Sequence, residues 1–133
     1  MIRGHCECGR VRFEVDSDIT DFSHCHCSQC RRLHGAAFAT FAGVTRDHFR
    51  YVSGENDTRN YASSDSHKRV FCAECGSNIL VALDEEPEIL YLSMSTLEGD
   101  PPRPPGYHIF VGSKAPWHEI TDDLQQYETN PPE

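Results

Sequence analysis

Three cysteines lie within six residues near the start of the chain, in the run Cys-His-Cys-Ser-Gln-Cys at positions 25–30. Thiolate sulfur is a soft ligand, so three such side chains could hold one zinc ion and leave one coordination position open. Three protein ligands and an open position are typical of a reactive zinc site. The spacing therefore predicts a reactive metal centre made of Cys25, Cys27 and Cys30.

A second reading of this run is a closed metal site completed by a nearby histidine. His24, His26 and His34 all lie close to the cysteines in the sequence. In extended chain, neighbouring side chains point to opposite sides, so His26 should point away from Cys25 and Cys27. His24 and His34 are the better candidates for a fourth ligand.

The other four cysteines form two pairs, each followed by glycine: Cys6 with Cys8, and Cys72 with Cys75. Together they predict a filled four-thiolate zinc site, which has no room for substrate and is therefore structural. Zinc–sulfur bonds of about 2.3 Å in a tetrahedron place the sulfurs about 3.8 Å apart, which a Cys-x-Cys pair in extended chain can reach. The alternative is four ordinary buried thiols. Two zinc ions per chain are expected in all.

The number of thiolates limits the chemistry of the predicted reactive centre. Three thiolates on a divalent ion give a net charge of −1, so the ion is a weaker Lewis acid than one held by neutral histidines. Hydrolysis by bound water is therefore disfavoured. A soft site with an open position suits an incoming thiol, which it would bind as thiolate and present as a nucleophile.

Composition excludes several classes of partner. The 133 residues suggest one domain, and the formal net charge of −9 argues against nucleic acid and against anionic membrane surfaces. No apolar run approaches the roughly 20 residues of a membrane-spanning helix, and the first residues carry no apolar signal core. We therefore expect a cytoplasmic protein, in which seven cysteines are metal ligands and not disulfides.

The hydrophobic pattern predicts a mainly all-β fold of several small antiparallel sheets, held together by zinc. One short helical turn is expected over 28–35, with Ser28 as its N-cap and Gly35 as its stop. A single β domain should span residues 1–120, followed by an acidic, frayed tail over 121–133. About eight short strands are expected, in the segments 11–15, 36–44, 49–52, 60–62, 68–71, 78–83, 89–94 and 107–111.

The ordered motifs resemble a known family. Gly-x-Cys-x-Cys-Gly-x-Val-x-Phe is followed by Cys-His-Cys-x-x-Cys-Arg-x-x-x-Gly-Ala, then by Phe-Cys-x-x-Cys-Gly-Ser, and last by His-Ile-Phe-Val and a tryptophan. This series is similar to the glutathione-dependent formaldehyde-activating enzyme family, also called the centromere-protein-V-like family. The similarity runs from about residue 4 to residue 117, and all seven cysteines match.

The resemblance implies a zinc-held β fold with a structural zinc on the four paired cysteines and a second zinc on the other three. It also implies a carbon–sulfur lyase that joins a small thiol, glutathione, to formaldehyde as S-(hydroxymethyl)glutathione. The carboxylates of glutathione would need cations. Arg31, Arg32 and Lys114 are the candidates, unless they are solvated surface charge. Trp117 could wall the pocket, or belong to the core or rim.

Two other functions remain open on the sequence. The domain could be a non-catalytic zinc-binding module whose second site responds to metal or redox state. A partner-binding platform has only the proline-rich segment 100–106 in its favour, and such segments are usually spacers.

Overall fold

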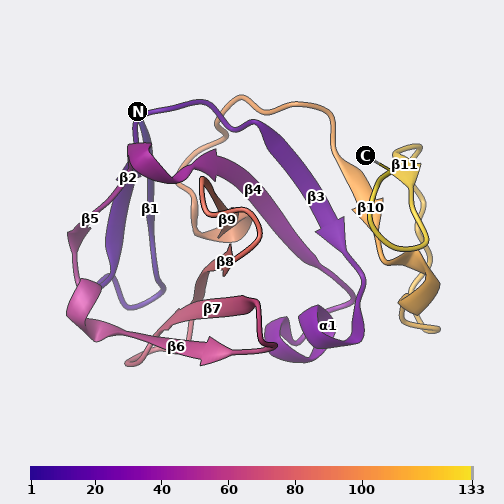
Figure 1. The fold of residues 1–133 in the computed structure, drawn as a ribbon, viewed down its shortest axis with the longest axis horizontal. Helices are drawn as coiled ribbons and strands as arrows, with labels where there is room; N and C mark the ends of the chain where they lie inside the picture. Colours follow the sequence, from indigo (N-terminus) through magenta and orange to yellow (C-terminus); the bar gives the residue numbers. More distant parts are fainter. Residues whose placement is uncertain (133) are drawn as a thin grey trace.

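The computed structural model describes residues 1–132 and contains mainly β structure, as predicted. One α-helix and several short 3₁₀ turns interrupt the strands (Figure 1). The strands are β1 (Ile2–His5), β2 (Arg12–Val15), β3 (Asp21–Cys25), β4 (Ala39–Thr45), β5 (Phe49–Ser53), β6 (Thr58–Ala62), β7 (His67–Cys72), β8 (Asn78–Leu83), β9 (Ile89–Ser93), β10 (Tyr107–Ile109) and β11 (Gln125–Gln126). The helix is α1 (Ser28–His34), and the 3₁₀ turns are η1 (Arg46–His48), η2 (Glu55–Asp57), η3 (Met94–Thr96) and η4 (Val111–Ser113).

The strands form two sheets. The smaller sheet has the order β1-β2-β5, and the larger has the order β11-β10-β3-β4-β9-β8-β7-β6. Most neighbours are antiparallel, but β10 runs parallel to both β3 and β11. The sequence pattern gave no sign of this parallel edge, because a three-residue strand carries too little periodicity to show its partner.

One of two clusters of buried hydrophobic residues joins the two sheets. Phe13 and Val15 from β2 are fully buried and belong to the same cluster as Val44, Ile79 and Leu92 from the larger sheet. Alternation of apolar and polar residues along β2 is what puts these two side chains on one face. Two thiols of the four-cysteine set, at positions 6 and 72, lie in this core as well.

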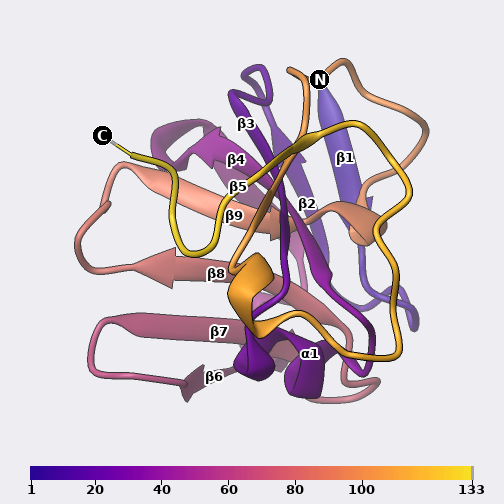
Figure 2. The same cartoon turned by 90° about the vertical axis from the view of Figure 1, so that its right-hand side faces the viewer.

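Helix α1 has only seven residues and connects β3 to β4 (Figure 2). Its N-cap is Cys27 and not Ser28 as predicted, because the Cys27 Sγ accepts the backbone N–H of Cys30. Sulfur is an uncommon cap, so the sequence rule favoured the neighbouring serine. Gly35 ends the helix in the left-handed region at φ 59°, as expected of a glycine stop.

The C-terminal stretch, which we expected to be frayed, folds back onto the sheet within the described residues; residue 133 lies outside them. Gln125 and Gln126 form β11 beside β10, and the backbone N–H of Tyr127 donates to the carbonyl of His108 at 2.9 Å. Figure 1 shows this segment at the edge of the larger sheet, next to β10. No helix within residues 1–132 has the length and apolar character to span a bilayer.

Candidate metal centres

The first cysteine cluster consists of Cys6, Cys8, Cys72 and Cys75, and the fold brings all four Sγ atoms within 4.8 Å of one another. The Sγ of Cys8 lies 3.5 Å from that of Cys6 and 3.8 Å from that of Cys72. Ligands on a tetrahedral zinc are separated by about 3.8 Å, so this spacing fits a four-thiolate metal site.

Two tight turns with glycine shape the first cluster. The N–H of Gly9 donates to the carbonyl of Cys6, and the N–H of Gly76 donates to the carbonyl of Cys72. Both glycines have φ near +79°, a conformation that costs other residues free energy. The N–H of Val11 also donates to the Cys6 Sγ at 3.3 Å. Such N–H donors stabilise thiolate charge, which supports the assignment of these sulfurs as metal ligands.

The second cysteine cluster consists of Cys25, Cys27 and Cys30, whose Sγ atoms also lie within 4.8 Å of one another. Cys25 ends β3, Cys27 caps α1, and Cys30 lies in the first turn of that helix. Only two residues separate the end of β3 from the start of α1, which is why all three sulfurs converge. Cys25 and Cys30 are buried, and Cys27 is half-buried.

Negative charge is favoured at one thiol of this cluster above the others. Hydrogen bonds with the thiols of Cys25 and Cys30 lower the pKa of Cys27, and the positive charge of Arg69 acts in the same direction. Contacts with the other two thiols, together with burial, raise the pKa of Cys25. A metal ion would add positive charge beside all three sulfurs and favour their thiolate forms further.

Arg69, on β7, is a functional candidate that the sequence did not reveal. Its side chain is only 5% exposed, and its Nη2 lies 3.5 Å from the Cys30 Sγ. The guanidinium also donates to Ser63 Oγ and Gln29 Oε1, each at 3.0 Å. Its Nη1 is buried and has no hydrogen-bond partner within residues 1–132. A buried guanidinium needs negative charge nearby, and the thiols of the second cluster supply it.

None of the three nearby histidines joins the second cluster. His24 shares a hydrogen bond with Thr40 Oγ1 at 2.8 Å, and His34 packs edge-on against Phe41. No ring nitrogen of His26 lies within 4.8 Å of all three sulfurs. Among residues 1–132, the cluster has three ligand atoms and no fourth Cys, His, Asp or Glu at the same spacing.

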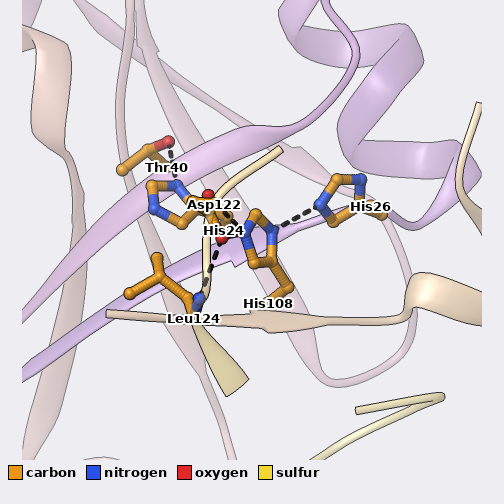
Figure 3. Close-up of polar contacts among 6 residues, drawn as sticks. All are labelled: His24, His26, Thr40, His108, Asp122 and Leu124. Carbon is orange, nitrogen blue, oxygen red and sulfur yellow. Dashed lines mark hydrogen bonds and ion pairs between the residues drawn. The ribbon is translucent and has the colours of Figure 1, made fainter. Parts of the chain in front are cut away.

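His26 instead takes part in a chain of hydrogen bonds that leads to the C-terminal segment (Figure 3). Its Nε2 lies 2.8 Å from Nδ1 of His108, whose Nε2 lies 3.0 and 3.1 Å from the two carboxylate oxygens of Asp122. Both rings are at most 1% exposed. Burial, followed by the charge of His108, lowers the pKa of His26 to about 4, so its ring is neutral at pH 7.

The residues expected to contact the thiol substrate are spread over two regions. Arg31 and Arg32 lie on α1 with the second cluster; Arg32 is exposed, and the buried Nε of Arg31 has no hydrogen-bond partner within residues 1–132. Lys114 follows η4, where its Nζ donates to the carbonyls of Ala115 and His118. Trp117 is 71% exposed.

Comparison with known proteins agrees with this architecture. The sequence model of the family described as glutathione-dependent formaldehyde-activating enzyme matches residues 1–113. A relative from Halomonas elongata named as a putative glutathione-dependent formaldehyde-activating enzyme is 32% identical over 127 residues, covering 90% of this chain and 81% of its own. An uncharacterized lyase of Schizosaccharomyces pombe is 29% identical over 79 residues, which is 59% of this chain and 56% of that protein.

A solved structure has the same fold. The crystal structure of a Rhodobacter sphaeroides protein superposes with a TM-score of 0.62 at 29% identity, covering 75% of this chain and 91% of the other. The family match covers most of the chain and includes all seven cysteines. The chain therefore belongs to the glutathione-dependent formaldehyde-activating enzyme family.

Proposed function

We propose that this protein is a zinc-dependent carbon–sulfur lyase that interconverts glutathione and formaldehyde with S-(hydroxymethyl)glutathione. The observation that carries the proposal is the contrast between the two cysteine clusters. One gathers four thiols, enough to fill a tetrahedral zinc site, while the other gathers three beside a buried arginine. The first cluster is then structural, and the second, Cys25, Cys27 and Cys30, is the reactive centre.

Thiolate donors at this spacing fit zinc in both clusters. When bound at the second cluster, zinc would supply positive charge that favours the deprotonated form of a substrate thiol. The three thiolates leave a net charge of −1 on such a site, and the Arg69 guanidinium offsets it. The same charge makes hydrolysis by activated water a poor match for this centre.

The proposed reaction makes and breaks few bonds. In the direction of synthesis, the glutathione sulfur forms a bond to the formaldehyde carbon, the π bond of the carbonyl breaks, and the thiol proton ends on the carbonyl oxygen as a hydroxyl. No oxidant or reductant is needed. The protein must therefore bind the thiol, orient its sulfur towards the aldehyde and hold both in one place.

Glutathione is an anion, and the protein carries a net charge of −9, so local cations must bind its carboxylates. Arg31 and Arg32 are proposed for this role because α1 places them next to the second cluster. Lys114 is proposed as a weaker contact, since its ammonium group already donates to two backbone carbonyls. Trp117 is proposed to offer an exposed aromatic surface to the bound thiol.

The proposal is tested by exchange NMR of glutathione and formaldehyde with and without zinc-loaded protein. We expect faster exchange between free glutathione and its hydroxymethyl adduct in the presence of the protein. Cys30→Ser should abolish the acceleration and retain one zinc per chain. Ser28→Ala is the matched control: its hydroxyl makes no side-chain hydrogen bond within residues 1–132, and it lies in the same helical turn.

Two results would count against the lyase assignment. Acceleration that survives in Cys30→Ser would show that the second cluster is not the reactive centre. If the protein binds two zinc ions but exchange between glutathione and its adduct is no faster than in buffer, the protein is a non-catalytic zinc-binding module. Arg31→Met refines the substrate: it should raise the KM for glutathione with little change in kcat if Arg31 binds a carboxylate equally in the ground and transition states.

A further inference from the structure

Arg69 is a buried cation without a carboxylate partner. Its side chain is 5% exposed, and none of the ion pairs found within residues 1–132 includes it. Taking a guanidinium out of water costs free energy unless an opposite charge lies nearby, so a buried arginine is usually paired with a carboxylate. Among its hydrogen-bond partners in the described part of the chain, only the Cys30 Sγ, 3.5 Å from Nη2, can carry negative charge.

The side chain of Gln29 holds this guanidinium in place. Gln29 directly precedes Cys30 on α1, and its Oε1 accepts a hydrogen bond from Arg69 Nη2 at 3.0 Å. Its Nε2 donates to the backbone carbonyl of Ser63 at 2.9 Å. The Oγ of Ser63 in turn accepts from Arg69 Nε at 3.0 Å. The three residues therefore form a closed ring of hydrogen bonds, which determines the end of the Gln29 amide that faces Arg69.

The ring joins three separate elements around the second cluster. Gln29 belongs to α1, Arg69 belongs to β7, and Ser63 follows the end of β6. Figures 1 and 2 show α1 beside the β6–β7 hairpin. Arg69 pairs with Val81, which is buried together with two thiols of the second cluster. The guanidinium is thus held where little water is present to screen its charge from the sulfurs.

The partner at position 29 is a neutral amide, and an amide leaves the charge of Arg69 available. A carboxylate at this position would form an ion pair with the guanidinium and cancel most of its effect on the sulfurs. The amide makes the same hydrogen bond and adds no charge. The positive charge of Arg69 is then compensated by the thiolates of the second cluster and by any anion that joins them.

We propose that Gln29 is a specificity-determining residue: its neutral amide anchors Arg69 beside Cys30 without cancelling the guanidinium charge, so that a metal ion at the second cluster takes a thiolate in preference to a neutral ligand such as imidazole. Three thiolates on a divalent ion have a net charge of −1, and a fourth makes it −2, which the guanidinium reduces to −1. A neutral fourth ligand gains much less from this cation. The inference rests on the part of the proposed function that places a metal ion at the second cluster, and not on the lyase reaction.

The test compares an anionic with a neutral ligand at the same site. The protein is loaded with cobalt(II) as a visible-absorption probe, and the bands of the second cluster are those that are absent in Cys30→Ser. It is titrated with 2-mercaptoethanol, which has no carboxylate and releases its thiol proton to the buffer on binding, and separately with imidazole. Gln29→Glu keeps the size of the side chain and adds one negative charge beside Arg69 Nη2. It should weaken binding of mercaptoethanol about 10–50-fold and binding of imidazole less than about 3-fold.

Two further variants show whether Gln29 acts through the guanidinium. Arg69→Met, with the second cluster saturated with cobalt(II), should shift the ratio of the two affinities in the same direction as Gln29→Glu. Ala36→Glu adds the same charge at an exposed position just after α1 and should leave the ratio unchanged. The proposal fails if Gln29→Glu weakens both ligands equally, if Arg69→Met leaves the ratio as in the native protein, or if Ala36→Glu has the same effect as Gln29→Glu.

The anchoring role has its own measurement, which uses no added ligand. In zinc-loaded, ¹⁵N-arginine-labelled protein, the Nε–H signal of Arg69 is the one that is missing in Arg69→Met. This proton should exchange slowly with water in the native protein, because it is buried and bonded to Ser63. In Gln29→Met, which cannot bond to Arg69 or to the Ser63 carbonyl, it should exchange at least about 10-fold faster. Equal protection in the two proteins would show that Gln29 does not hold the guanidinium.

The outcomes separate this inference from the proposed function. A second cluster that binds no metal ion refutes both. A protein that prefers thiolate in the way described but does not accelerate exchange between glutathione and its adduct refutes the lyase assignment and leaves the role of Gln29 standing. An active lyase whose ligand preference is unchanged in Gln29→Glu refutes the role of Gln29 alone.

Discussion

Removal of the Arg69 guanidinium should weaken metal binding at the second cluster and leave the first cluster unchanged. Arg69→Met keeps most of the side-chain length and deletes the charge that lies 3.5 Å from the Cys30 Sγ. A hydrogen bond to a charged group contributes about 1.5–3 kcal/mol. Since about 1.4 kcal/mol is a factor of ten, the metal affinity of this site should fall about 10–150-fold.

The assay is stepwise release of zinc to a chromophoric chelator. The step that belongs to the second cluster is identified by its absence in Cys30→Ser. Lys68→Met is the matched control, because it removes one positive charge from an exposed residue that is next to Arg69 on β7. If Arg69→Met releases both ions as the native protein does, the guanidinium does not offset thiolate charge and the reasoning fails. Equal weakening at both sites would instead indicate general loss of structure.

Three further predictions concern stability. Cys72→Ser should lower the free energy of unfolding in urea by more than about 4 kcal/mol, because we expect metal binding at the first cluster to be coupled to folding. Cys30→Ser should lower it much less. Equal losses in the two variants would contradict a structural role for the first cluster. Gly54→Ala should cost about 2–4 kcal/mol, since φ is +78° and the new Cβ would lie 2.1 Å from a backbone carbonyl oxygen; thermal unfolding near the native Tm would refute this. Burial and a carboxylate hydrogen bond raise the pKa of Tyr107, so the folded state keeps this proton after the unfolded phenol ionises near about pH 10, and stability falls as pH rises above that value. Tyr107→Phe should flatten that fall, and an unchanged alkaline slope would exclude Tyr107 as its source.

The two cysteine clusters could be predicted from the sequence because local spacing determines most of their geometry. A Cys-x-Cys pair before a glycine turn and a Cys-x-x-Cys knuckle each need only a few residues of backbone to aim their sulfurs. The three-cysteine run is almost entirely local, since one strand end and one helical turn contain it. Alternating apolar residues predicted most strands for the same reason.

Residues contributed by distant segments could not be predicted. In the sequence, Arg69 is one of several cations in a predicted strand. Only the pairing of β7 within the larger sheet brings its side chain to Cys30. His108 reads as an ordinary strand residue until the parallel pairing with β3 places it opposite His24. Asp122 lies in an acidic stretch that looked frayed, because two paired residues leave no recognisable pattern. The contacts of these three residues depend on tertiary pairing, which sequence periodicity does not predict.

The separation of the paired cysteines along the chain has a consequence for biosynthesis. Residues 25–30 hold a complete set of three thiols once the first quarter of the chain has been made, but the four-thiol set needs residue 75. At about 5–20 residues per second, the interval between these points is about 2–9 s. During that time the growing chain carries the three thiols of the proposed reactive centre without the four-thiol set that would bind the proposed structural metal. Metal supply and thiol oxidation in those seconds would therefore act on the proposed reactive centre before the rest of the fold has formed.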